Sequence, residues 1–472
     1  MKINLNMSAV MTNKQLLRTE NNLQKSMMRL SSGYKLNAPS DNPAGMAISN
    51  KMQAQIDALK QAKSNSSDAV SVVEVADGAL DEVSSVLQRI RELSVQAANE
   101  SNTYDDKQSI QAEIDQLTKE VDRISTDTEF NTKKLLDGSS DKRVYTRTQT
   151  TDASGNIVAT LSDAVSRVNI SDEVASKKYE ITATAGEKAT TDIGIPSGVD
   201  GTISINNVGV TVSSDMTRDE FLQSLQEAVT QAGCEMTVNA DDTVTIETNK
   251  YGTAATIDIE VSASLSSVSD GSYTVDESGN LTKKFYGTNA SVTLGSGFTG
   301  NATVTTEGNR AYIKDNSGFT MDFLINADIE ADSNLEIDVT DIGEMTIQIG
   351  ANQYQSMDVG IPEISSESLY LDTVDVTVEG GASEAITTLD EAISKVSSAR
   401  SKIGAFQNRL EYAASSLDES AEDMTGAYSR IMDTDMAEEM TEYTQQNILD
   451  QASISVLSQA NDIPEQILTL LS

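Results

Sequence analysis

A run of apolar residues spaced by sevens near the end of the chain limits the possible folds more than any other feature. A repeat of this kind places a narrow stripe along one side of an α-helix, and the stripe is buried against a neighbouring helix. A coiled-coil helix carries a second stripe beside the first. Ile386 and Ile393 are expected to occupy this companion stripe, which turns polar at Arg400 and Gln407. A long coiled-coil helix is therefore predicted from the residues spaced by sevens: Leu389, Val396, Ile403, Leu410, Leu417, Met424 and Ile431.

The beginning of the chain has a related pattern. Leu16, Leu23 and Leu30 are also spaced by sevens, and Ser31, Ser32 and Gly33 are expected to end this helix. A connector over residues 37–45 follows, and helix is expected again from Met46. Further stripes with alternating steps of three and four run through residues 80–97 and 110–124. The connector is predicted from Pro39, Asp41, Asn42 and Pro43.

A last apolar stripe runs almost to the C-terminus and is expected to be buried against a partner. Residues 1–60 contain 8 basic and 3 acidic residues, whereas residues 411–472 contain 1 basic and 13 acidic residues. Opposite charge favours antiparallel packing of the two ends of the chain. The stripe consists of Leu449, Ala452, Val456, Ala460, Ile463, Ile467 and Leu470.

Between about Ser140 and Gly343 the pattern changes to the alternation typical of strands. Residues 202–205, 208–212, 243–247 and 256–260 alternate in this way, and Asn206-Asn207 is a plausible hairpin turn. One short helix is expected from Arg218 to Gln231, with Phe221, Leu222, Leu225 and Val229 on one face. The predicted fold class is therefore a multidomain α+β protein, mainly α at both termini, with a β-rich insertion of one or two small domains.

Composition excludes several functions. The chain has 472 residues, a net charge of −39, no histidine, no tryptophan and one cysteine. Without histidine there is no Ser-His-Asp triad and no histidine-ligated zinc, and one cysteine forms no internal disulfide. We therefore expect no enzymatic activity, cofactor or metal site. The acidic chain offers no basic patch for nucleic acid.

Membrane insertion is not expected either, because no stretch approaches the 18 or so apolar residues of a membrane helix. Residues 1–17 interrupt their apolar residues with polar ones and do not resemble a secretory signal. The sequence leaves two locations open: the cytoplasm, or export by a route that reads no such signal.

Several motifs at both ends are similar to those of bacterial flagellins. The resemblance covers about residues 1–138 and 343–472. A module over 201–258 also resembles a small repeat found inserted in flagellins. The matching motifs are Leu30-Ser-Ser-Gly-Tyr-Lys-Leu-Asn-Ala-Pro-Ser-Asp-Asn-Pro-Ala-Gly-Met-Ala-Ile48, Gln88-Arg-Ile-Arg-Glu-Leu-Ser-Val-Gln-Ala-Ala-Asn99, Ile347-Gln-Ile-Gly-Ala-Asn352, Gly404-Ala-Phe-Gln-Asn-Arg-Leu410 and Gln451-Ala-Ser-Ile-Ser-Val-Leu-Ser-Gln-Ala-Asn461.

The resemblance implies a structural subunit that polymerises with itself into an extracellular flagellar filament and is exported unfolded through the flagellar type III apparatus. It implies inner-core segments at residues 1–42 and 430–472, a helical middle layer at 43–140 and 344–429, and a variable outer region at 141–343. The implied partners are a flagellin-specific export chaperone at the C-terminal segment, the filament cap and the hook–filament junction proteins. A hook–filament junction protein is the alternative identity.

Two sets of site residues follow. Filament-core contacts are expected from the terminal stripes, with Leu16, Leu23 and Leu30 packing against residues of the C-terminal stripe. A helix face at residues 88–113 is implied to contact neighbouring protofilaments and, where exposed, the vertebrate innate receptor Toll-like receptor 5; Ile110 could equally be a core residue. The face comprises Gln88, Arg89, Leu93, Gln96, Ile110 and Glu113. The filament-core set comprises Leu16, Leu23, Leu30, Leu449, Val456, Ile463, Ile467 and Leu470.

Overall fold

A computed structural model describes residues 6–151, 157–171, 173–196, 198–239, 243–268, 273–275 and 280–471. The chain forms two compact units, which we describe separately. The first comprises residues 1–70, 347–357 and 408–472, and the second comprises residues 71–346 and 358–407.

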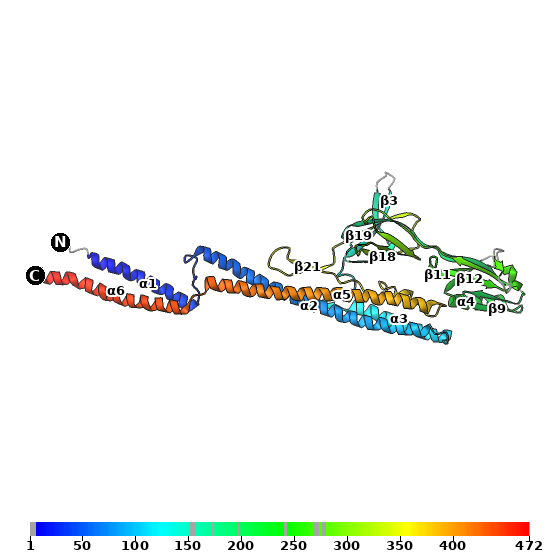
Figure 1. Cartoon of the computed structure of the whole chain (residues 1–472), viewed down its shortest axis with the longest axis horizontal. Helices are drawn as coiled ribbons and strands as arrows, with labels where there is room; N and C mark the ends of the chain where they lie inside the picture. The colour runs from blue at the N-terminus through cyan, green and yellow to red at the C-terminus, as the bar shows by residue number, and fades with distance from the viewer. Residues whose placement is uncertain are drawn as a thin grey trace. The chain divides into compact units, whose positions relative to one another are not determined.

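Long helices form both ends of the chain, as the sequence predicts. In the first unit α1 and α6 lie side by side and antiparallel (Figure 1). The side chain of Asn6 caps α1 by accepting a hydrogen bond from Ala9, and Gly33 ends α1 with a φ of 75°. The helices are α1 (Met7–Ser32), α2 (Pro43–Ala97), α3 (Tyr104–Asp127), α4 (Arg218–Gln231), α5 (Gly381–Met432) and α6 (Met436–Leu471), with short 3₁₀ turns η1 (Ala263–Val268) and η2 (Leu371–Thr373).

The apolar stripe of α5 is buried, which confirms the main part of the seven-residue pattern. Leu389, Val396, Ile403 and Leu410 are at most 1% exposed. The companion position differs from the expectation, because Ile386 and Ile393 are only half-buried. It is occupied by alanines, whose small side chains allow close approach of a neighbouring helix: Ala385, Ala392 and Ala399.

In the second unit α2 and α5 are joined by ion pairs. The Arg400 guanidinium, at the polar break in the companion stripe, lies 3.0 Å from Asp77 and 2.7 Å from Asp81 of α2. Arg91 of α2 lies 2.6 Å from Asp390 of α5. Between these pairs the α2 stripe is fully buried from Leu80 to Ile90. The predicted packing of N-terminal on C-terminal helices is therefore confirmed in this unit.

The insertion is β-rich, as predicted, and is built around two hydrophobic cores. One core lies between a five-stranded sheet, in the order β15-β6-β19-β3-β4, and a four-stranded sheet, in the order β16-β17-β18-β5. The other lies between a five-stranded sheet, in the order β13-β14-β12-β8-β9, a three-stranded sheet, in the order β10-β11-β7, and α4. All of the strand pairs in these sheets are antiparallel.

The strands have the following bounds: β1 (Glu129–Phe130), β2 (Lys133–Lys134), β3 (Arg143–Thr151), β4 (Ile157–Leu161), β5 (Val165–Ile170), β6 (Lys178–Thr184), β7 (Lys188–Gly194), β8 (Gly201–Ile205), β9 (Val208–Val212), β10 (Cys234–Val238), β11 (Thr243–Tyr251), β12 (Thr256–Val261), β13 (Thr274–Val275), β14 (Leu281–Tyr286), β15 (Ser291–Leu294), β16 (Thr303–Glu307), β17 (Arg310–Lys314), β18 (Thr320–Ile325), β19 (Ser333–Thr340), β20 (Met345–Gln348) and β21 (Ser356–Val359).

Local sequence explains the module around residues 201–258. Asn206 and Asn207 form the predicted turn, with φ values of 47° and 69°, as a two-residue hairpin turn with the twist of the strands requires. Thr217 and Glu220 form a capping box at the start of α4. Phe221, Leu225 and Val229 of α4 are buried. The same core also takes in residues of β7 and β14, which lie outside 201–258.

Candidate functional site

The paired terminal helices α1 and α6 are held by polar contacts between distant parts of the chain. The Asn6 amide donates a 2.8 Å hydrogen bond to the Ala460 carbonyl. The Ser26 hydroxyl donates a 2.6 Å hydrogen bond to the Glu439 carboxylate, and Arg29 lies 3.6 Å from the same side chain. At the other end of the pair, the Lys35 amide donates to the Met432 carbonyl. These contacts fix one antiparallel register.

The inner side of this pair is unusually polar for a helix interface. Thr19 and Ser26 of α1 are buried, as is Glu439 of α6. A carboxylate oxygen of Asp450, also on α6, is buried and makes no hydrogen bond within the described residues. A buried polar group without a partner costs free energy, so this interface contributes little net stability to a single chain.

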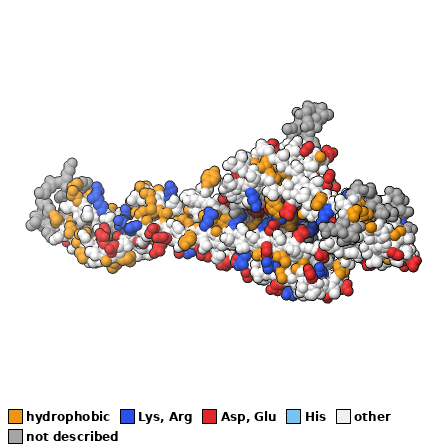
Figure 2. Space-filling view, turned by 45° about the vertical axis from the view of Figure 1, so that its right-hand side comes forward, with side chains coloured by type: hydrophobic (Ala, Val, Ile, Leu, Met, Phe, Trp, Pro, Cys, Tyr) orange, Lys and Arg blue, Asp and Glu red, His pale blue; other side chains and the backbone are white. Residues whose placement is uncertain are grey.

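The outer side of the pair, in contrast, exposes many large apolar side chains among its polar ones. Val10 and Leu17 of α1 are 56% and 53% exposed, and Val456 and Ile463 of α6 are 51% and 49% exposed. Apolar side chains are visible on the surface of this helix pair (Figure 2). Exposed apolar surface of this extent is typical of a surface that another molecule covers. The other large exposed apolar side chains of the two helices are Met7, Met11, Met27, Met28, Met436, Met440, Ile448, Leu449 and Ile454.

This arrangement differs from the expected pairing of the two stripes within one chain. Leu16, Leu23 and Leu30 are half-buried, whereas Leu449, Val456 and Ile463 lie on the exposed side of α6. The reason is that the polar stripe of Glu439 and Asp450 occupies the position facing α1. The side chains of Ile467 and Leu470 lie outside the described residues. Sequence reasoning missed Met440 and Ile448, although their eight-residue separation, two steps of four, marks one helix face.

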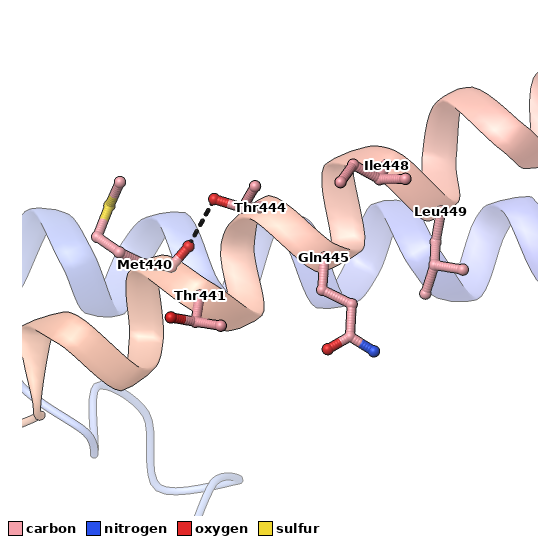
Figure 3. A pocket seen from close by; sticks show the side chains of 6 residues that line it. All are labelled: Met440, Thr441, Thr444, Gln445, Ile448 and Leu449. Carbon is pink, nitrogen blue, oxygen red and sulfur yellow. Dashed lines mark hydrogen bonds between the residues drawn. The ribbon is translucent and has the colours of Figure 1, made fainter.

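A shallow groove of about 520 Å³ lies on the exposed side of α6. Its walls are two rows of residues spaced by four, Met440-Thr444-Ile448 and Thr441-Gln445-Leu449 (Figure 3). The Thr444 hydroxyl donates to the Met440 carbonyl and so keeps its polar group against its own helix. Rows of this spacing are the ridges and grooves into which a second helix packs. The groove is therefore suited to helix–helix contact.

The predicted connector residues lie at the start of α2 and just before it. Asp41 accepts hydrogen bonds from the amides of Asn37 and Ala38, and the Asn42 side chain accepts one from the amide of Gly45. Pro43 is the first residue of α2 and so lies in the helix, not in the preceding connector. Pro39 lies in the turn.

The second set of candidate residues lies on α2 and α3. The Arg89 guanidinium lies 2.8 Å from Glu113 and 3.2 Å from Glu92, so the structure brings Arg89 and Glu113 together. These hydrogen bonds raise the pKa of Arg89 above its usual value. Gln88 and Gln96 are exposed, whereas Leu93 and Ile110 are buried, at 2% and 8% exposure. Leu93 and Ile110 thus pack in the core, and the accessible face consists of the four polar residues.

Over the described part of the chain, no group of three or more Asp, Glu or Cys side chains is arranged to hold a metal ion. No described helix has the length and apolar character that crossing a membrane requires.

Comparison with known proteins identifies the class to which these helices belong. Residues 3–141 match the bacterial flagellin N-terminal helical region, and residues 386–471 match the bacterial flagellin C-terminal helical region. A flagellin of Clostridium tyrobutyricum is 33% identical over 466 residues, covering 98% of this chain and 99% of that protein. Flagellin B of Vibrio anguillarum is 29% identical, covering 99% of each chain.

Among solved structures, flagellar hook associated protein-3 of Legionella pneumophila aligns with a TM-score of 0.31 and 14% identity, over 81% of this chain and 98% of that chain. FliC of Burkholderia pseudomallei aligns with a TM-score of 0.24 and 16% identity, over 72% of this chain and 99% of that chain.

The two matching terminal regions and the near-full-length similarity to flagellins define a flagellar structural protein. The chain belongs to the flagellin family, the structural subunits of the bacterial flagellar filament. Flagellins are filament components on the outside of the cell and are not enzymes.

Proposed function

We propose that this chain polymerises through the exposed apolar side of its α1·α6 pair, which becomes the inner core of the filament. The observation that carries this proposal is that polar residues such as Ser26 and Glu439 are buried between the helices, while many large apolar side chains of both helices are exposed. In a filament, identical copies would bury Val10, Leu17, Val456 and Ile463. Residues 1–42 and 430–472 would form this core, 43–140 and 344–429 the surrounding helical layer, and 141–343 the outer region.

The polar residues buried between α1 and α6 also support coupling of folding to assembly. A single α1·α6 pair buries little apolar surface, too little to offset the conformational entropy of ordering two long helices. We therefore expect these segments to be weakly structured in the free subunit and to become ordered when copies stack. Limited proteolysis of subunits and filaments tests this, because equal resistance of the termini in both would contradict it.

A charge placed on the outer face tests the assembly site. Ile463→Asp is expected to abolish filaments while leaving a soluble subunit, because an unpaired carboxylate would be buried between copies. Ile463→Val, which keeps the position apolar, is the matched control and should still form filaments. Negative-stain imaging of both variants after seeded polymerisation decides the outcome. Filaments of normal length from Ile463→Asp would show that this face is not buried in the polymer.

Export unfolded through the flagellar type III apparatus, without a cleaved signal peptide, is also proposed. A flagellin-specific chaperone would then bind the C-terminal segment, where Met440, Ile448 and Ile454 are exposed. At its ends the polymer would meet the filament cap and the hook–filament junction proteins. Loss of secretion on removal of residues 436–471, with normal synthesis in the cell, is the expected result.

We further propose that Gln88, Arg89, Gln96 and Glu113 form a contact face between protofilaments, which Toll-like receptor 5 reaches on the free subunit. The exposure of these four residues and the Arg89–Glu113 ion pair support it. Arg89→Ala should lower receptor signalling by the subunit, whereas Arg123→Ala, on the neighbouring helix α3, should not. Equal signalling by both variants would contradict the receptor role.

The alternative function is a hook–filament junction protein. Near-complete coverage of relatives that are flagellins favours the filament subunit. The abundance of the chain in sheared surface filaments distinguishes the two, because a junction protein would be present in only a few copies for each filament.

A further inference from the structure

Three basic residues of α1 form a row on the outer side of the α1·α6 pair. Lys14, Arg18 and Lys25 are exposed, and their steps of four and seven place them along one side of the helix. Arg18 and Lys25 directly precede the buried Thr19 and Ser26. Because each residue turns an α-helix by about 100°, the three basic residues, which we call the basic row, point away from the side that contacts α6.

The basic row has no carboxylate partner within ion-pair distance in the described part of its own chain. Among the described residues, α1 and α6 share one ion pair, that of Arg29 with Glu439. Glu20, the acidic residue of α1, is neither three nor four residues from any member of the row, so it is not a neighbour on the helix surface. The row therefore presents three charges that its own chain does not neutralise.

Helix α6 carries the opposite charge, since it contains acidic residues and no lysine or arginine. Glu438 and Glu442 are exposed one helical turn apart, and neither makes an ion pair among the described residues. Glu442 stands seven residues before Leu449, so it continues the exposed row of Leu449, Val456 and Ile463. The two glutamates thus lie at one end of this exposed apolar stripe.

Within one chain these glutamates are out of reach of part of the basic row. Ser26 contacts Glu439, which lies between the two glutamates. Lys14 precedes Ser26 by twelve residues, about 18 Å along the axis at 1.5 Å per residue. At the level of Lys14 the acid of α6 is Asp450, which faces α1 and makes no ion pair among the described residues. Asp462 is exposed towards the far end of α6.

The proposed filament contact would bury the basic row. Lys14 is four residues from Val10 and three from Leu17, so the three side chains share one patch of helix surface. A copy that covers Val10 and Leu17 therefore covers Lys14 as well. Burial of a charge is costly unless an opposite charge accompanies it. We therefore expect the covering copy to supply carboxylates.

Charge also selects which helices of two copies can meet. Contact of α1 with α1, or of α6 with α6, brings like charges together, which is repulsive. Contact of α1 with α6 of another copy brings opposite charges together. This second contact joins different surfaces of the two copies, and a heterologous contact that does not close into a ring extends as an open helical filament.

We propose that the basic row of α1 pairs with Glu438 and Glu442 of α6 in a neighbouring copy, and that these ion pairs select α1-to-α6 stacking in the polymer. The pairing rests on the proposed function, because it requires copies to meet through the outer side of the α1·α6 pair. Ion pairs at a helix contact set the choice and orientation of the partner, whereas the apolar side chains around them supply most of the free energy of contact.

The test reverses the two sets of charges in separate full-length chains. One variant carries Lys14→Glu, Arg18→Glu and Lys25→Glu, and the other carries Glu438→Lys and Glu442→Lys. Each variant alone places like charges at the α1-to-α6 contact, so its critical concentration for polymerisation should rise about tenfold or more. An equimolar mixture restores opposite charges between the two kinds of chain and should polymerise near the parent concentration. Sedimentation and negative-stain imaging measure the polymer.

The mixture separates pairing between copies from pairing within a chain, because every chain in it still carries like charges on its own α1 and α6. A mixture that needs as high a concentration as the separate variants would overturn the proposal, as would polymerisation of either variant at the parent concentration. The two variants change the net charge in opposite directions, so net charge does not explain a loss in both. Lys14→Arg with Lys25→Arg keeps the charge and should polymerise like the parent chain.

The outcome is distinguishable from failure of the proposed function. Filaments of normal length from Ile463→Asp would remove the inner-core proposal and the ion pairs with it. Loss of filaments from Ile463→Asp, together with normal polymerisation of the charge-reversed variants, would overturn the ion pairs alone and leave the inner-core proposal standing.

Discussion

The hydroxyl of Ser26 donates a 2.6 Å hydrogen bond to the carboxylate of Glu439, across a separation of 413 residues. Both side chains are buried between α1 and α6. This contact, with the nearby Arg29, specifies which residues of the two helices lie opposite each other. A polar contact inside a helix pair fixes register and contributes less to stability than apolar packing would.

Glu439→Ala should weaken the filament. It leaves the Ser26 hydroxyl buried without its acceptor, a loss of about 1–3 kcal/mol for each subunit if the pair is retained in the polymer. The measurement is the temperature at which filaments depolymerise, followed by light scattering. Glu438→Ala changes an exposed neighbour and serves as the control. If both variants depolymerise at the same temperature, the register contact does not persist in the filament.

Arg310→Met should destabilise the second unit. The Arg310 guanidinium lies 3.8 Å from the centre of the Tyr370 ring and 4.3 Å from that of Tyr312, and it pairs with Asp322 and Glu391. Methionine keeps much of the packing but leaves these groups without a cation, at a cost of roughly 3 kcal/mol in the free energy of unfolding. Urea unfolding followed by circular dichroism measures this cost.

The control for that prediction is Arg123→Met. Arg123 also lies near two carboxylates, Glu120 and Asp127, but its side chain is 55% exposed. Exposed ion pairs contribute little, so its urea midpoint should stay close to that of the parent chain. Similar midpoints for the two variants would show that burial does not decide the contribution of Arg310.

Ala392→Leu tests whether the alanines of α5 form its buried companion stripe. Ala392 is 2% exposed, so a larger side chain should force the neighbouring helix away, at a cost of about 1–3 kcal/mol in unfolding free energy. Ile393→Leu, at the half-buried position next to it, should cost less, because its surroundings can adjust. Thermal unfolding of both variants measures the two costs. A larger cost for Ile393→Leu than for Ala392→Leu would show that the isoleucines, and not the alanines, are the packed residues.

Cys234 should be unreactive in the folded chain. Its thiol is buried at the start of β10, and burial raises its pKa to about 11. Because the folded pKa exceeds the unfolded one, the thiol's contribution to stability is fully present below about pH 9 and is lost as the pH rises through 11. Labelling with a thiol-specific chromophore at pH 8 should be slow in buffer and fast in denaturant. Rapid labelling in buffer would mean that this core opens readily.

Local pattern predicted much of the fold. The strands around residues 201–261, the turn at Asn206-Asn207 and the bounds of α4 follow from short-range features, namely alternation, turn chemistry and a capping box. The long helices follow from spacings of three, four and seven, which repeat often enough to identify an amphipathic helix unambiguously.

Burial at particular positions was harder to predict. The spacing by sevens predicts Ile386 and Ile393 in the companion stripe of α5, because isoleucine is the more apolar residue, yet Ala385, Ala392 and Ala399 are the buried residues. Close approach of two helices selects small side chains, and the distance between helices is not encoded in either helix alone. The environment of Arg310 carries no local signal in the sequence, because its neighbours Asp322, Tyr370 and Glu391 come from β18, the segment before α5, and α5.

The sequence by itself determined that this chain has helical ends, a β-rich middle, no histidine-based chemistry and the motifs of the flagellin family, because periodicity and composition are properties of the residues alone. Only the tertiary structure decided which side of each terminal helix faces its partner. A buried polar contact such as Ser26–Glu439 requires two segments in one register, and that register turns the apolar side of α6 outward. The exposed apolar surface is therefore a consequence of pairing, which no single helix specifies.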